Sequence, residues 1–141
     1  MYYIIYDSFG KILSKIQYST EIEAEDFIEI TEEQFITLDI SRAKLNLESF
    51  QFEELPEFDP LYQSYNYETG EVETNLEALE FIIKSRRDRL LSESDWTDTV
   101  SAQTRLGETL YNAWQTYRQS LRDIPQQEGY PLNINWPAPP I

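Results

Sequence analysis

The chain of 141 residues contains no cysteine and no histidine, and it has only 4 glycines. Without cysteine it forms neither a disulfide framework nor a thiolate nucleophile, and an intracellular origin is expected. Without histidine it carries no Ser-His-Asp or Cys-His catalytic arrangement and no His-containing zinc site. The few glycines make neither a P-loop nor a Gly-x-Gly-x-x-Gly motif, which excludes phosphate binding by a glycine-rich loop.

Long hydrophobic runs are also missing. No stretch approaches the roughly 18 apolar residues of a membrane-spanning helix. The N-terminal segment MYYIIYDSFGK lacks the basic residues and the long apolar run of a signal peptide. We therefore predict a soluble protein that is made in the cytoplasm and has no membrane partner.

Positive charge is scarce, and the imbalance is confined to the first half of the chain. Residues 1–80 contain 4 Lys and Arg against 19 Asp and Glu, which accounts for the whole net charge of −15, whereas residues 81–141 contain 7 of each. This change predicts a domain boundary near residue 80. Because an acidic surface repels phosphate backbones, we expect no nucleic-acid partner, although a basic protein partner is compatible with the charge.

Residues 1–74 predict a small, acidic, antiparallel β-rich domain. Two runs rich in Tyr and Ile flank the turn at residues 7–10 and predict a β-hairpin, and the alternation in DFIEI predicts a further strand. Thr31 and Gln34 form a Thr-x-x-Gln capping box that begins a short helix. The side chains expected on the buried face of this helix are Phe35, Ile36 and Leu38.

Two further strand segments are predicted before residue 75. The segment AKLNLESFQFEEL alternates apolar and polar residues with a one-residue slip at Glu48-Ser49, which indicates a β-bulge. The segment YNYETGEVE is typical of a strand pair whose turn places Gly70 in the left-handed conformation. No internal repeat is apparent.

The apolar spacing becomes helical after residue 74. A first helix is predicted from Leu76 to a polar break at residues 92–94, and Pro125 ends a second helix because proline disfavours the α conformation in the residue before it. The second helix carries one continuous apolar stripe, formed by Leu106, Leu110, Trp114, Tyr117 and Leu121. The predicted fold class is therefore α+β: the β-rich domain, then an αα-hairpin over residues 75–124, then an extended Pro-rich tail over residues 125–141.

Carboxylates are the remaining side chains that could support catalysis or metal binding. The densest run comprises Glu21, Glu23, Glu25, Asp26 and Glu29. Its spacing does not match an EF-hand loop, and nothing pairs two carboxyls as a glycosidase requires. We interpret the run as a solvated acidic face, and we expect neither enzymatic activity nor a metal nor a cofactor.

The aromatic residues of the second half have two interpretations. Trp114 and Tyr117 lie on the apolar stripe, so a place in the core is favoured over direct contact with a partner. Trp136 lies in NWPAPPI, a segment too short to form its own core. It is either an intramolecular strap on the helices or part of an arm offered to another protein, and both interpretations stand.

The charged residues near the second helix have simpler interpretations. Arg118 and Arg122 are four residues apart on one face. We interpret them as a solvent-facing pair that bridges to acids such as Asp123 or Asp88 and contributes little to stability. Asp95 is interpreted as an N-cap between the two helices.

Three segments in order resemble the C-terminal region of phage tail fibre assembly proteins, also called tail assembly chaperones. They are RRDRLLSESDWT, WQTYRQSLRDIPQQEGYP and NWPAPP, between about residue 86 and residue 140. Members of the family often have a proline soon after Asp-Trp-Thr, whereas this chain has DTVSAQTRLGETLYNA there. The first 80 residues share only the generic opening IYD-x-x-G-x-I.

The resemblance implies a non-enzymatic factor that acts in the host cytoplasm. It would bind a tail fibre or other tail subunit and assist its folding, trimerisation or attachment; the alternative is a structural component retained on the virion tail fibre or baseplate. A homo-oligomer is left open. An acidic DNA mimic ranks below both, because the carboxylates alternate with apolar strand residues. The residues that mark the family motif or the expected partner interface are Asp95, Trp96, Trp114, Tyr117, Arg118, Arg122, Asp123, Trp136, Pro137, Pro139 and Pro140.

Overall fold

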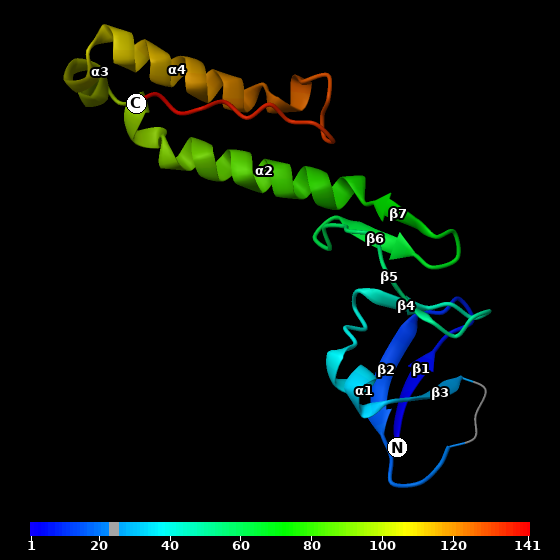
Figure 1. The fold of residues 1–141 in the computed structure, drawn as a ribbon. Helices are drawn as coiled ribbons and strands as arrows, with labels where there is room; N and C mark the ends of the chain where they lie inside the picture. The colour runs from blue at the N-terminus through cyan, green and yellow to red at the C-terminus, as the bar shows by residue number, and fades with distance from the viewer. Residues whose placement is uncertain (23–25) are drawn as a thin grey trace. The chain divides into compact units, whose positions relative to one another are not determined.

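The computed structural model describes residues 1–22 and 26–141, and the chain divides into two compact units, Met1–Glu73 and Thr74–Ile141 (Figure 1). Antiparallel strands occupy the first unit and helices the second, in agreement with the α+β class. Glu23 and Glu25 of the acidic run lie outside the described residues.

A three-stranded antiparallel sheet begins the first unit, with β1 (Tyr2–Tyr6) between β2 (Ile12–Gln17) and β3 (Phe27–Ile30). The predicted hairpin is confirmed: Gly10 ends its turn with a φ of 79°. A side chain at this position would collide with the carbonyl oxygen of Leu45, so the turn requires glycine both for its conformation and for this close approach.

The predicted capping box is confirmed at α1 (Glu32–Thr37), where Thr31 and Gln34 each satisfy the other's backbone N–H. The buried face is narrower than predicted. Phe35 and Leu38 pack against the core of the first unit, but Ile36 is 72% exposed. In so short a helix the positions i and i+3 share one face, and the residue after the first points about 100° away from it.

Two short hairpins follow: β4 (Ala43–Leu45) with β5 (Phe52–Glu54), and β6 (Gln63–Asn66) with β7 (Glu71–Thr74). Gly70 adopts the predicted positive φ, at 76°. The predicted bulge at residues 48–49 is wrong, because these residues form the turn between β4 and β5. The two hairpins also repeat one turn, which was not predicted from the sequence.

The second unit is helical. Its elements in chain order are α2 (Leu76–Glu93), the 3-10 turn η1 (Asp95–Asp98), α3 (Val100–Leu106), α4 (Glu108–Arg122) and the 3-10 turn η2 (Ile124–Gln126). None of the described helices is long and apolar enough to cross a membrane.

The second predicted helix is in fact two helices, and it ends earlier than expected. Gly107 separates α3 from α4 with a φ of 75° and a ψ of 160°, a conformation essentially reserved for glycine. The apolar stripe continues from Leu106 to Leu110 across this break and therefore conceals it. α4 ends at Arg122, and Ile124 and Pro125 lie in a 3-10 turn instead of an extended segment.

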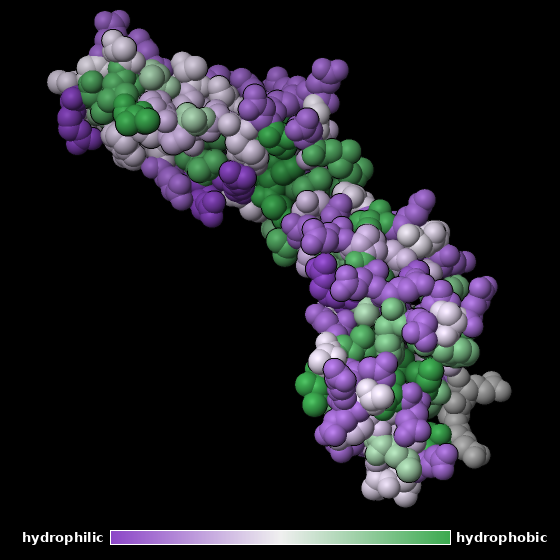
Figure 2. Space-filling model, viewed as in Figure 1, coloured by the Kyte–Doolittle hydropathy of each residue, from purple (hydrophilic) through white to green (hydrophobic). Residues whose placement is uncertain are grey.

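The core of the second unit is built from α2, α4 and the C-terminal residues. Its buried members are Ile83, Tyr117, Leu121 and Ile124. Tyr130, Ile134 and Trp136 pack against them from residues 127–141, which we call the C-terminal strap. The strap runs back between α2 and α4 (Figure 1). An apolar surface is visible over the N-terminal half of α2 and the turn after α4 (Figure 2).

Candidate functional site

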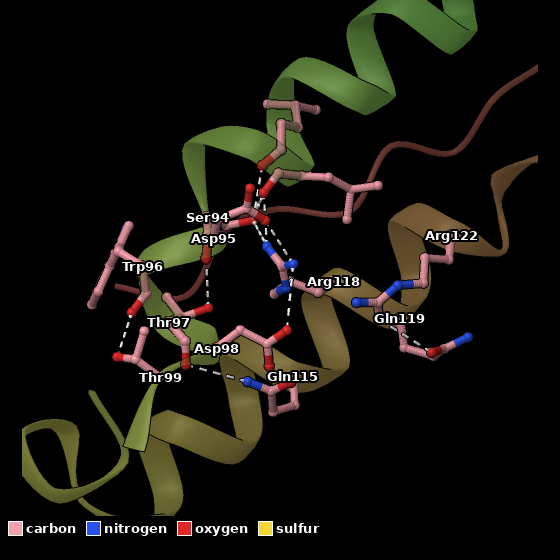
Figure 3. Close-up of polar contacts among 12 residues, drawn as sticks. Ser94, Asp95, Trp96, Thr97, Asp98, Thr99, Gln115, Arg118, Gln119 and Arg122 are labelled. Atoms are coloured by element: carbon pink, nitrogen blue, oxygen red, sulfur yellow. Dashed lines mark hydrogen bonds and ion pairs between the residues drawn. The ribbon is translucent and has the colours of Figure 1, made fainter. Parts of the chain in front are cut away.

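The connection between α2 and α4 is held by one buried arginine. Arg118, only 5% exposed, extends from α4 to the end of α2. Its Nη1 donates to the carbonyl oxygen of Leu91 at 2.7 Å and to Oγ of Ser94 at 2.8 Å, and its Nη2 donates to Oδ1 of Asp95 at 2.9 Å (Figure 3). A carboxylate oxygen of Asp98 lies 3.7 Å from the same Nη2. A planar guanidinium suits this site because its donors point in several fixed directions at once.

The predicted roles of Arg118 and Asp95 are therefore wrong. Arg118 is buried and not solvent-facing, and Asp88 pairs with Arg87 instead. Asp95 does not cap a helix: Ser94 holds the N-cap position of η1, and the Asp95 carboxylate accepts from Arg118. The prediction failed because helical spacing shows which residues share a face, but it does not show where the chain after α2 returns.

Two buried hydroxyls shape the turn that presents Asp95. Ser94 Oγ donates to the carbonyl oxygen of Leu90 at 2.8 Å, and the carbonyl oxygen of Leu91 lies 3.0 Å from the same Oγ. These contacts close the last turn of α2. Thr97 Oγ1 donates to the carbonyl oxygen of Ser94 at 2.7 Å. Both side chains are almost fully buried and bonded to the backbone, so the Asp-Trp-Thr motif here serves first to fix a backbone turn.

An aromatic series lies beside this turn. Trp96 contacts Trp114 edge-on at 5.5 Å between ring centroids, and Trp114 contacts Tyr117 at 5.6 Å. Tyr117 and Trp114 belong to the core cluster, as expected from the stripe. Trp96 remains 44% exposed, with the Arg105 guanidinium carbon 5.8 Å from its ring centroid. The series thus connects the core to one exposed aromatic surface, the kind of side chain that anchors protein contacts.

The electrostatic environment of Tyr117 follows from its position. Burial raises the pKa of its hydroxyl above the ordinary 10.0, the carboxylate of Glu93 raises it further, and Arg86 opposes both. The phenol therefore stays neutral throughout the physiological range.

The C-terminal strap is held by stacking and by one side-chain amide. The Arg86 guanidinium carbon lies 4.2 Å from the ring centroid of Trp136. Nε2 of Gln127 donates to the carbonyl oxygen of Asn135 at 2.9 Å, and Oε1 of Gln127 accepts from the backbone N–H of Asn135 at 2.8 Å. Pro139 lies at a small hollow beside Trp114 and Tyr117. Of the two interpretations of Trp136, the structure therefore has the intramolecular strap.

The remaining candidate residues lie apart from these contacts or at their margin. Arg122 is exposed, with Nη1 3.4 Å from Oε1 of Gln119. Asp123 occupies the C-cap of α4 and accepts from Nε2 of Gln119 at 2.9 Å. Pro137 and Pro140 are half-buried in the strap.

Several residues of the site were not predicted from the sequence. Ser94 and Asp98 flank the Asp-Trp-Thr motif, and Gln127 lies in a polar stretch without periodicity. Arg86 interrupts the apolar spacing of α2. An arginine within an apolar helix face can stack on an aromatic ring, and this interruption is the signal in the sequence that could have indicated the contact with Trp136.

The arrangement is suited to structural support and protein contact. No group of three or more His, Cys, Asp or Glu side chains that could hold a metal occurs in residues 1–22 and 26–141. The polar groups that converge on Arg118 bond to one another and to the backbone.

A comparison with known families covers this same unit. Residues 81–141 match the family model described as phage tail assembly chaperone protein. No curated protein and no solved structure matches the chain. The matched segment begins within α2 and includes the Arg118 contacts and the whole C-terminal strap. The resemblance inferred from the sequence motifs is thereby confirmed, and residues 81–141 are a match to the phage tail assembly chaperone protein family.

Proposed function

We propose that this protein is a phage tail assembly chaperone that binds a tail fibre or another tail subunit and assists its folding, trimerisation or attachment. The observation that carries the proposal is the family match over residues 81–141. A chaperone acts by binding, which implies a role other than catalysis. Its place of action would be the host cytoplasm during assembly.

The two units suggest a division of roles. The helical unit carries the family match, so we assign it the contact common to such chaperones, with Trp96 as its exposed aromatic anchor. The first 80 residues lie outside the match, so we assign them the choice of subunit. They offer β3 as an edge strand of the sheet, and an edge strand is able to pair with a strand of an incompletely assembled subunit.

Co-expression with a tail fibre subunit of the same phage tests the proposal. We expect the chain to raise the yield of soluble, trimeric fibre, to co-elute with the subunit in size-exclusion chromatography, and to be missing from purified virions by mass spectrometry. Presence in the virion at fixed stoichiometry would instead identify a structural component of the tail. If the chain neither co-elutes nor changes fibre solubility, the assembly role is wrong.

A pair of surface variants assigns the common contact. Trp96→Ala removes the exposed aromatic ring, and Val100→Ala, at a neighbouring site that is 83% exposed, is its control. We expect only Trp96→Ala to reduce co-elution. Equal co-elution of both variants with the subunit would place the contact elsewhere.

A further inference from the structure

The hairpins β4–β5 and β6–β7 are built on the same turn. Asn46 begins one turn and Asn66 the other. In each, the asparagine Oδ1 accepts from the N–H groups two and three residues later, at 3.0 and 3.1 Å in the first hairpin and at 2.9 and 3.0 Å in the second. The Nδ2 atoms donate to Glu53 and Glu73, seven residues on, at 2.6 Å in both. The shared pattern is Asn-x-Glu-Ser/Thr-x-x-x-Glu, a duplicated hairpin.

The two copies differ at the one turn residue that has a positive φ. Four residues after each asparagine, the N–H group returns to the asparagine carbonyl at 2.8 Å, and this residue has a positive φ. In the second copy it is Gly70, for which a φ of 76° carries no steric cost. In the first copy it is Phe50, at a φ of 54°, a conformation that a bulky side chain disfavours.

Burial within this unit does not compensate for that conformation. The Phe50 side chain is 50% exposed. A glycine stands at the matched position of the second hairpin, so the turn itself has no need of a phenylalanine. Unfavourable backbone conformations cluster at functional sites, so the conformation of Phe50 points to a contact outside the fold.

Two other exposed apolar residues lie in this turn or in the adjacent one. Leu47, in the same turn, is 37% exposed, and Phe9, in the turn between β1 and β2, is 50% exposed. The Leu45 N–H donates to the carbonyl of Gly10 at 2.8 Å, so the two turns lie side by side (Figure 1). We call Phe9, Leu47 and Phe50 the hairpin-tip patch.

Charges of both signs lie near this patch, but the lysines there contact other residues of the first unit. Lys11 lies over the ring of Tyr67, and Lys44 pairs with Glu53 and lies over Tyr65, so the lysines of these hairpins are turned toward their own unit. Asp7 and Glu48 belong to the two turns that carry the patch. An apolar surface bordered by carboxylates is complementary to an apolar pocket bordered by cations.

We propose that the hairpin-tip patch docks into an apolar pocket bordered by lysine or arginine on the tail subunit that this protein assists, with Phe50 as the anchor. The inference rests on the proposed function and extends it, because it names a second surface of the first unit, besides the edge strand β3, that recognises the subunit, and the chemistry that the subunit must present. It also gives the acidic first unit a role in recognition.

The substitution Phe50→Gly tests the anchor, because it copies the natural residue of the second hairpin. We expect the thermal unfolding temperature of the variant to equal or exceed that of the unmodified chain, since the unfavourable backbone conformation is relieved. Its affinity for the purified tail fibre subunit, measured by isothermal titration calorimetry, should fall about tenfold or more. Ile36→Ala, at an exposed site on α1, is the control and should bind like the unmodified chain.

The outcomes separate this inference from the proposed function. If the unmodified chain binds the fibre subunit and Phe50→Gly binds equally well, the anchor is wrong while the chaperone role stands. If the unmodified chain does not bind, both fail. Affinity that does not decrease with added salt would contradict the cationic border of the pocket. Should Phe50→Gly fail to fold by circular dichroism, Phe50→Asn takes its place, because asparagine also tolerates a positive φ.

Discussion

At the scale of single residues, Arg118 holds α4 against the end of α2. Its partners are a carbonyl oxygen, a buried hydroxyl and a carboxylate that is itself 66% exposed. The exposed carboxylate adds little, because solvent screens the ion pair. Most of the stabilisation comes from the two partners that would lose their donor at the buried end of α2.

Arg118→Ala should therefore lower the free energy of unfolding by roughly 2–4 kcal/mol. Asp95→Asn should cost no more than about 1 kcal/mol. Urea unfolding followed by tryptophan fluorescence measures both, since all three tryptophans lie in residues 74–141. If Asp95→Asn is as damaging as Arg118→Ala, the ion pair and not the backbone contact holds the turn.

Tyr117 predicts a pH dependence at the alkaline end. Burial raises the pKa of its hydroxyl in the folded state above the 10.0 of an unfolded tyrosine. The fold therefore favours the neutral phenol: this contribution is complete below pH 10.0 and is lost as the pH rises through the higher pKa of the folded state. Thermal unfolding between pH 8 and pH 11, on either side of about 10, should show a smaller alkaline loss of stability in Tyr117→Phe than in the unmodified chain. Identical losses in the two proteins would contradict this assignment.

At the scale of elements, Gly107 decides that α3 and α4 are two helices. Space is not the constraint, since an added Cβ would meet no atom within 4 Å. The constraint is the backbone conformation, so Gly107→Ala should destabilise the helical unit by about 1–3 kcal/mol. Glu108→Ala, at the neighbouring exposed position, is the matched control. A gain in both helicity and stability would mean that the two helices merge, as their continuous stripe suggests.

The C-terminal strap makes a second prediction at this scale. Trp136 is half-buried against the core and stacked on Arg86, so Trp136→Ala should cost about 1–3 kcal/mol, less than a fully buried tryptophan. Leu132, in the same segment, is 71% exposed, and Leu132→Ala should have almost no effect. Thermal unfolding followed by circular dichroism compares them. Equal stabilities of the two variants would show that the strap contributes nothing to the core.

Sequence reasoning succeeded where the signal is local. The capping box at Thr31, the hairpin turn at Gly10 and the positive φ at Gly70 each depend on a few adjacent residues, and each is confirmed. It failed where the signal is a contact between distant segments: Arg118 with Asp95, and Arg86 with Trp136. Periodicity also failed at Gly107, because an apolar stripe records which side faces the core and not whether the helix is continuous.

At the scale of the whole molecule, the two units differ most in charge. Carboxylates dominate the first unit, whereas the charges of residues 81–141 balance. Like charges in a compact unit repel one another, and salt screens that repulsion over a Debye length of about 8–10 Å. Added salt should therefore stabilise the first unit and leave the second nearly unchanged.

Hydrogen exchange measured by mass spectrometry tests this prediction, because it reports on both units in the same sample. Between low and high sodium chloride concentrations, peptides from β1–β3 should gain protection, whereas peptides from α2 and α4 should not. A uniform gain in both units would indicate a general effect of salt on hydrophobic burial in place of charge screening.

The Gln127 amide determines the direction in which neighbouring side chains of the C-terminal strap point. By bonding both the N–H and the carbonyl of Asn135, it imitates a neighbouring strand over a single residue and sets the phase of the backbone there. Successive side chains of an extended chain alternate in direction, so this one fixed residue directs Ile134 and Trp136 together toward the helices. One residue inserted between Asn135 and Trp136 would reverse the alternation and turn the tryptophan to solvent. The strap therefore tolerates changes of composition at its exposed positions far better than any change of length.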